Sequence, residues 1–126
     1  MKKEKVNVVI EKTSTGYSAY TEEYPVAVGG DSIEEIKNEV LYGLNFYHED
    51  KGKEFTMDQL VFIVDLSSFF KLYPVINAAA LSKKVGMNKT LLSQYVTGKK
   101  KPSEKQVQKI LNGVREVGRE LSQVSF

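Results

Sequence analysis

The chain has 126 residues, of which 41% are hydrophobic and 27% are charged, so its composition is that of a globular protein and not of a disordered one. It has no cysteine and one histidine, which excludes disulfides, thiolate zinc sites and a histidine-rich metal site. The longest apolar run, residues 60–64, is far too short for a membrane span, and the first residues lack a secretory pattern. We therefore expect a cytoplasmic protein that does not bind a membrane, with one ordinary domain or two small ones.

The net charge of +2 conceals a difference between the two halves of the chain. Residues 1–73 carry 8 Lys and no Arg against 13 acidic residues, a net of −5, whereas residues 74–126 carry 8 Lys and 2 Arg against 3 acidic residues, a net of +7. This asymmetry indicates that the halves face different partners. The alternative is that the bias serves solubility alone.

The first half begins with three short stretches of strand pattern. Val6, Val8 and Ile10 alternate with polar neighbours, as in a half-buried strand. A turn at residues 13–16 and a second strand at 17–21 complete a predicted hairpin. A third strand is predicted after Pro25.

A helix and a fourth strand complete this half. Ser32 and Glu35 have the spacing of a capping box. Apolar residues then recur every three or four positions and predict a helix to about His48: Ile33, Ile36, Val40, Leu44 and Tyr47. Residues 60–66 are apolar on both faces and predict a covered strand. We predict an α+β protein, with a small antiparallel βββαβ domain at residues 1–70 and an all-α domain at residues 71–126.

No motif in the first half predicts catalysis. Gly29 and Gly30 precede a helix, but their spacing fits neither common phosphate-binding loop, and the nearby acids would repel a phosphate. No spacing compels a metal site from the scattered acids Glu11, Asp31, Glu35 and Asp65. His48 is expected to be solvated or to compensate a helix dipole. We therefore expect a protein that is not an enzyme and holds no metal or cofactor.

Three helices are predicted in the second half. The first spans residues 77–85 and ends at Gly86. Asn88 is a good N-cap for the second, at residues 89–96, which Gly98 ends. Three lysines at 99–101 follow, and Pro102 and Ser103 then open a long third helix.

Residues 81–99, LSKKVGMNKTLLSQYVTGK, resemble the helix-turn-helix of the Cro and phage-repressor family, with Ser82 where that family usually has alanine. A short polar helix flanked by cations suits the major groove of DNA. The resemblance implies that Lys89, Thr90 and Gln94 approach base edges of double-stranded operator DNA. It places a second group nearer the DNA backbone: Asn77, Asn88, Ser93, Thr97, Lys99, Lys100 and Lys101. The alternative is a small helical bundle whose lysines are merely solvated.

The first half carries a resemblance of its own. The segments GYSAY at 16–20, Pro25 and GDSIEEIKNE at 30–39 resemble the HicB-type antitoxins, although Val26 follows Pro25 where that family commonly has Pro-Gly. The resemblance extends over nearly the whole chain and includes YVTGK at 95–99 and PSEKQ at 102–106. These proteins join a partial ribonuclease-H-like domain to a DNA-binding domain. The resemblance implies a type II antitoxin that neutralises a HicA-type mRNA-cleaving toxin through its N-terminal domain and represses its own operon. An acidic first half suits a basic toxin, and a basic second half suits DNA.

Two other functions stay open. A stand-alone transcription regulator would use the same basic domain, with the first half serving dimerisation or ligand sensing. A nuclease relic would require metal-dependent RNA cleavage. For a DNA reader we expect a homodimer or a higher even oligomer, because two-fold helix-turn-helix proteins match half-sites about one helical turn apart.

Overall fold

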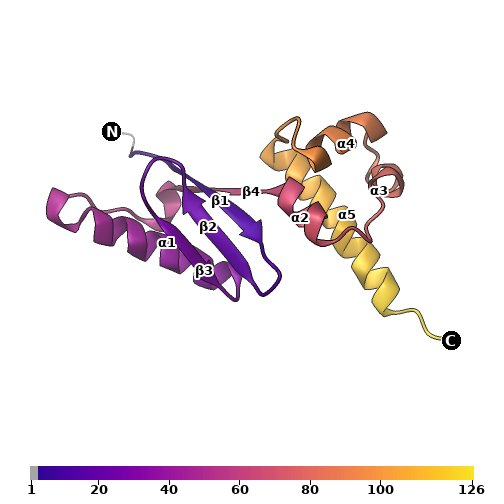
Figure 1. Ribbon diagram of the computed structural model, residues 1–126, viewed down its shortest axis with the longest axis horizontal. Helices are drawn as coiled ribbons and strands as arrows, with labels where there is room; N and C mark the ends of the chain where they lie inside the picture. Colours follow the sequence, from indigo (N-terminus) through magenta and orange to yellow (C-terminus); the bar gives the residue numbers. More distant parts are fainter. Residues whose placement is uncertain (1–2) are drawn as a thin grey trace. The chain divides into compact units, whose positions relative to one another are not determined.

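The computed structural model describes residues 3–126 as a mixed α/β protein with a four-stranded sheet and five α-helices (Figure 1). The chain divides into two compact units, the first ending at Leu72 and the second spanning Tyr73–Phe126. Among the described residues, no helix is both long enough and apolar enough to cross a membrane.

The first unit contains the sheet. Its strands are β1 (Val6–Lys12), β2 (Tyr17–Thr21), β3 (Ala27–Gly30) and β4 (Leu60–Val64), and they lie in the order β3-β2-β1-β4. β2 is antiparallel to both of its neighbours, but β4 runs parallel to β1. The prediction of an antiparallel sheet is therefore wrong for the fourth strand. The reason is the helical crossover between β3 and β4, which is long enough to bring the chain back for a parallel pairing.

Helix α1 (Ile33–Tyr47) covers one face of this sheet. Ser32 Oγ accepts a hydrogen bond from the Glu35 amide at 3.1 Å, and Glu35 accepts one from the Asp31 amide at 2.9 Å, so the predicted start of the helix is confirmed. The buried helix residues pack with the inward residues of the strands to form the core: Ile36, Val40 and Leu44 with Val6, Val8, Ile10 and Ala19.

His48 ends α1 and is buried, so the solvated role expected for it is wrong, while the alternative, compensation of the helix dipole, stays a prediction. Its Nδ1 lies 2.8 Å from the carbonyl oxygen of Leu44, where it donates to a carbonyl at the helix terminus. The rings of Tyr24, Tyr47 and Phe55 surround the imidazole edge-on, with centroids 4.6, 4.8 and 5.0 Å away. The histidine therefore caps the helix end from inside an aromatic cluster.

A short helix that the sequence analysis did not predict, α2 (Leu66–Leu72), follows β4 and contacts β1. The strand expected over residues 60–66 stops at Val64 because Asp65 begins this helix. Asp65 Oδ1 accepts from the Ser68 amide at 3.1 Å, and Oδ2 accepts from the Ser68 hydroxyl at 2.8 Å. This is the side-chain cap that a helix N-terminus requires.

The second unit consists of α3 (Ala78–Val85), α4 (Lys89–Thr97) and α5 (Glu104–Ser122). Both ends of α3 and α4, and the start of α5, match the predicted bounds to within about a residue. Its buried apolar residues are Leu81, Leu92, Tyr95, Val107 and Ile110. Gly113 permits a close approach between α5 and α3, because a Cβ at this position would lie 2.2 Å from Val85 Cγ1.

Candidate nucleic-acid interface

A three-residue turn joins α3 to α4 and fixes where α4 begins. Gly86 closes α3 in the left-handed conformation, with φ of 68°, and the Met87 amide donates to the Ser82 carbonyl at 2.9 Å. Ser82 is buried, and its hydroxyl donates to the Ala79 carbonyl at 2.6 Å. Ser82 is therefore small enough for a buried position in α3, and its hydroxyl is not left unpaired.

Helix α4 has one buried face and one open polar face. Leu92 and Tyr95 point into the core. Thr90, Ser93 and Thr97 are exposed and recur every three or four residues, so they share the opposite face. The other two residues predicted to read bases lie beside this face: Lys89 is exposed and Gln94 is half-buried. The side chains named for base contact are thus brought together on one helix.

Two asparagines cap helices with their oxygens. Asn77 Oδ1 accepts from the Ala80 amide at 3.1 Å, and Asn88 Oδ1 accepts from the amides of Thr90 and Leu91 at 2.9 and 3.1 Å. In each case the amide NH₂ is the group not used by the cap. A phosphate oxygen accepts hydrogen bonds and does not donate them, so these caps leave the group that a phosphate contact needs.

Thr97 is less suited to the phosphate contact predicted for it. Its hydroxyl donates to the carbonyl oxygen of Ser93 within α4 at 2.9 Å. A hydroxyl has a single hydrogen to donate, and a phosphate only accepts. Thr97 can therefore contact a phosphate only if it exchanges this internal bond.

The loop after α4 carries the lysine cluster, Lys99–Lys101, and all three side chains are exposed. Gly98, with φ of 82°, ends the helix, and the Lys100 amide donates back to the Gln94 carbonyl at 3.2 Å. The cluster is thereby held beside the C-terminal end of α4. Clustered cations at such a place favour contact with a phosphate backbone.

Two of the three acids of this unit are paired with one lysine of α3, and neither is paired with the lysine cluster. Lys84 of α3 lies 2.9 Å from Glu120 and 3.6 Å from Glu116 of α5. The hydrogen bond to Glu120 is the main cause that raises the pKa of Lys84 above its ordinary value. Lys84 offsets one of these two negative charges, and the unit as a whole keeps a net charge of +7 over residues 74–126.

Lys109 of α5 is a cation that the sequence analysis did not assign to the site. Its Nζ lies 3.5 Å from the carbonyl oxygen of Gly86, which places it at the turn between α3 and α4. The helical period shows that Lys109 faces away from the α5 core line, but it does not show which neighbouring segment it meets.

Two of the four acids considered as metal ligands serve local structure. Glu35 and Asp65 belong to the helix caps described above. In the described part of the chain, residues 3–126, no three side chains of the metal-binding types gather where they could hold an ion.

Comparisons of the chain with protein-family models, with curated proteins and with solved structures found no match. A function is therefore inferred from the residues of the chain itself, and above all from the polar face of α4 and the cations around it.

Proposed function

We propose that the second unit is a helix-turn-helix domain that binds double-stranded DNA and reads base edges with α4. The observation that carries the proposal is the open face of this helix, where hydroxyl, amide and ammonium groups lie together between the capping Asn88 and the lysine cluster. A helix of this width fits the major groove, where each base pair presents a distinct pattern of donors and acceptors.

The groups divide by chemistry into two roles. The Gln94 amide can both donate to and accept from an adenine, and Lys89 can donate to a guanine. Thr90 can accept or donate, or contact a thymine methyl group through its own methyl. The lysines at 99–101 and the NH₂ groups of Asn77 and Asn88 contribute affinity through phosphates, without sequence information.

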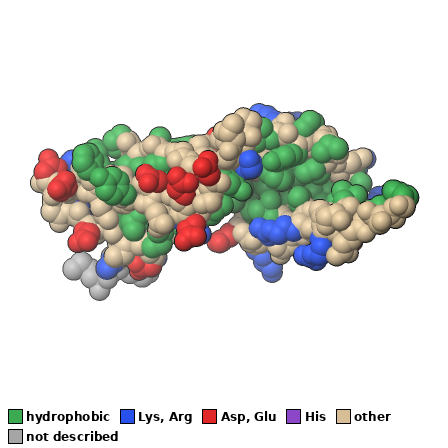
Figure 2. Space-filling model, turned by 90° about the horizontal axis from the view of Figure 1, so that it is seen from below, with side chains coloured by type: hydrophobic (Ala, Val, Ile, Leu, Met, Phe, Trp, Pro, Cys, Tyr) green, Lys and Arg blue, Asp and Glu red, His purple; other side chains and the backbone are tan. Residues whose placement is uncertain are grey.

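We propose further that the chain is an antitoxin, which holds a HicA-type mRNA-cleaving toxin through its first unit and represses its own operon through the second. The support is the resemblance of residues 16–39 to HicB-type antitoxins together with the division of charge. In the view of Figure 2, Asp and Glu side chains predominate on the first unit and Lys and Arg side chains on the second. Complementary charge favours a basic partner for one and DNA for the other.

The DNA proposal is tested by selecting duplexes from a randomised pool with the full chain, and then measuring binding to the selected duplex as a function of salt. Gln94→Ala should weaken the selected duplex by about fivefold to a hundredfold and leave random DNA unchanged, because one bidentate base contact carries about 1–3 kcal/mol of discrimination. Lys100→Ala should weaken both DNAs alike and reduce the salt slope by about 1.

Lys71→Ala is the matched control, since it removes an exposed lysine from α2 in the first unit. It should change neither the selected sequence nor the salt slope. Equal losses on selected and random DNA for Gln94→Ala would reject base reading by this residue. A pool that stays random after selection would reject the proposal as a whole.

The antitoxin proposal is tested separately, by co-expressing the chain with a HicA-type toxin encoded beside it. Restored growth is the expected result. Sequence-specific DNA binding without any effect on such a toxin would instead favour a stand-alone regulator.

A further inference from the structure

One edge of the sheet in the first unit is open. β3 is the outermost strand, and its pairing with β2 brings Ala19 opposite Val28 and Tyr20 opposite Ala27. The Thr21 amide donates to the Val26 carbonyl at 3.0 Å, and this bond shows which residues of β3 direct their backbone groups toward β2, because they alternate along the strand. In this alternation the N–H and C=O groups of Ala27 and Gly29 point away from β2. They form a template on which another extended chain can pair.

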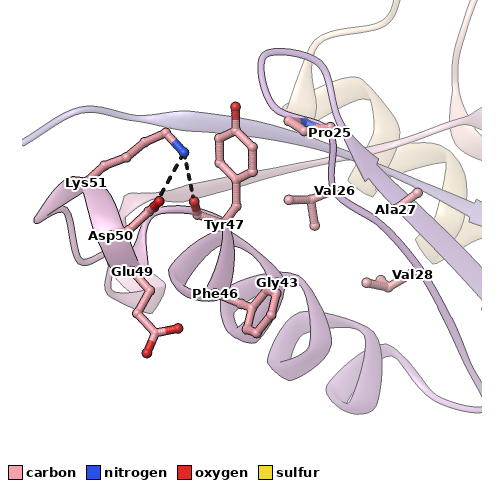
Figure 3. Close-up of a pocket in the computed structure, with 10 residues that line it drawn as sticks. All are labelled: Pro25, Val26, Ala27, Val28, Gly43, Phe46, Tyr47, Glu49, Asp50 and Lys51. Atoms are coloured by element: carbon pink, nitrogen blue, oxygen red, sulfur yellow. Dashed lines mark hydrogen bonds and ion pairs between the residues drawn. The ribbon is translucent and has the colours of Figure 1, made fainter.

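A groove of about 770 Å³ lies between this edge strand and α1. Figure 3 shows the side chains of Val26 and Val28 extending from the strand side toward the helix, with Phe46 on the α1 side. The helix can approach the strand this closely because a Cβ at Gly43 would lie 2.9 Å from Val26 Cγ1. The groove thus has apolar walls next to unpaired backbone groups.

Two aromatic side chains of α1 stand exposed at this place. Tyr42 and Phe46 are 69% and 67% exposed, although their rings stack on each other with centroids 6.2 Å apart and planes 20° from parallel. Phe46 also lines the groove. Single exposed apolar residues are ordinary, but a stacked pair beside an apolar groove is typical of a surface that binds a partner.

The charge around the groove is negative. Glu49 and Asp50 line it, and Glu39 lies one helical turn before Gly43 on α1. The cation in the lining, Lys51, is engaged locally: its Nζ donates to the Tyr47 carbonyl at 3.1 Å and lies 3.7 Å from Asp50. The same groove on a second copy would be equally acidic, so pairing of two such edges would gain nothing from charge. A basic partner matches the charge, and the whole first half has a net charge of −5.

We propose that the groove between β3 and α1 receives an extended segment of a basic protein, which pairs with β3 as an additional strand. Its backbone bonds to Ala27 and Gly29, an apolar side chain packs against Phe46 and Val28, and a Lys or Arg side chain meets Glu49. The inference rests on the proposed antitoxin function in taking that protein to be the toxin. The site itself does not depend on DNA binding.

The test uses ¹⁵N-labelled full chain and a ten-residue peptide with two lysines at each end and alternating valine and threonine between them, so that lysine and valine share a face in either strand direction. The expected result is saturable shifts of the Ala27, Gly29 and Phe46 amide signals. A peptide with glutamate in place of lysine should cause none of these shifts. Peptides with N-methyl groups on every second residue, made in both frames, should lose binding in at least one frame, because one frame blocks the strand pairing.

Phe46→Ala should weaken the peptide by about tenfold, since a partly buried aromatic contact is lost. Phe126→Ala is the matched control, because it removes an exposed phenylalanine beyond the end of α5 and should not change the affinity. Equal binding of the lysine and glutamate peptides, or shifts that avoid β3, would overturn the proposal. Concentration-dependent shifts of Ala27 and Gly29 without peptide would overturn it too, since they would assign the edge to a second copy.

The toxin experiment separates this inference from the function on which it rests. If the wild type neutralises the toxin and Phe46→Ala does not, the result supports both the antitoxin function and the groove as the toxin-binding site. Neutralisation that Phe46→Ala and Glu49→Lys leave intact keeps the antitoxin function and overturns the groove as its site. Peptide binding in the groove without any neutralisation overturns the antitoxin function and leaves the surface to another basic protein.

Discussion

Replacement by alanine should change the free energy of unfolding differently at the two glycines of α5. Gly113 is buried against α3, whereas a Cβ at Gly118 would have no atom within 4 Å. Both lie inside the helix, so replacement by alanine gives each position the same gain in helix propensity, about 0.5–1 kcal/mol. The difference between the two variants therefore measures the packing of α5 on α3.

The size of that difference follows from one distance. A Cβ at Gly113 would lie 2.2 Å from Val85 Cγ1, whereas carbon atoms in contact are about 3.5–4.0 Å apart. Val85 cannot easily turn away, because a valine in a helix has one strongly preferred χ1 rotamer. Overpacking of this kind costs about 1–3 kcal/mol. Gly113→Ala should thus be neutral to destabilising by about 2.5 kcal/mol, while Gly118→Ala should stabilise by about 0.5–1 kcal/mol.

The assay is urea unfolding of both full-length variants, followed by helical circular dichroism. Amide hydrogen exchange in α3 and α5 assigns the change to the second unit. The free energies of unfolding should differ by about 1–3 kcal/mol, with Gly118→Ala the more stable. Equal stabilisation by both substitutions would refute the close approach of α5 to α3.

Three further predictions concern individual hydrogen bonds. Asn88→Ala should destabilise the second unit by about 0.5–2 kcal/mol in urea unfolding. Asn88→Asp should keep the cap and yet weaken DNA binding, because its negative charge repels a phosphate. Equal DNA affinity for Asn88→Asp and wild type would reject the phosphate contact. Asn45→Ala should destabilise the first unit by about 1–3 kcal/mol, because the Asn45 amide donates to the Phe55 carbonyl at 3.1 Å and accepts from its amide at 2.6 Å; an unchanged melting curve would contradict this. The hydrogen bond to Glu120 raises the pKa of Lys84, so the stability that this pair contributes is complete below the unfolded-state pKa of Lys84 and is lost as the pH rises through its folded-state pKa. Glu120→Gln should therefore reduce the fall in the free energy of unfolding at alkaline pH. An unchanged fall would contradict the role of the pair.

Elements with a strong local signal were predictable from the sequence. The Ser32 capping box, the αL glycines Gly86 and Gly98 and the N-cap Asn88 all act within a few residues, and the helices begin and end where these residues predict. The direction of β4 was not predictable in this way. Its pairing with β1 joins residues about fifty positions apart, and an apolar strand fits a parallel or an antiparallel neighbour.

The misses in the first unit have local causes. Helix α2 was overlooked because its apolar start at Leu66 continues the apolar run of β4, although Asp65 followed by Ser68 gives a cap signal. The burial of His48 was not predicted, because its aromatic neighbours Tyr24 and Phe55 come from separate loops that only the fold brings together.

The candidate nucleic-acid interface also has some features that the sequence predicts and others that it does not. The polar face of α4 follows from the helical period, so the grouping of Thr90, Ser93 and Thr97 was predictable. The bond from the Thr97 hydroxyl to the Ser93 carbonyl and the position of Lys109 at the Gly86 turn depend on side-chain geometry, which the sequence does not specify.

The most direct test of DNA reading by α4 is an NMR titration of the ¹⁵N-labelled full chain with its selected duplex at physiological salt. We expect the largest amide shifts at Lys89–Gln94 and Lys99–Lys101, with residues 3–72 nearly unchanged. Shifts confined to the first unit, or to the surface of α5 with α4 unaffected, would contradict the proposed role of this helix.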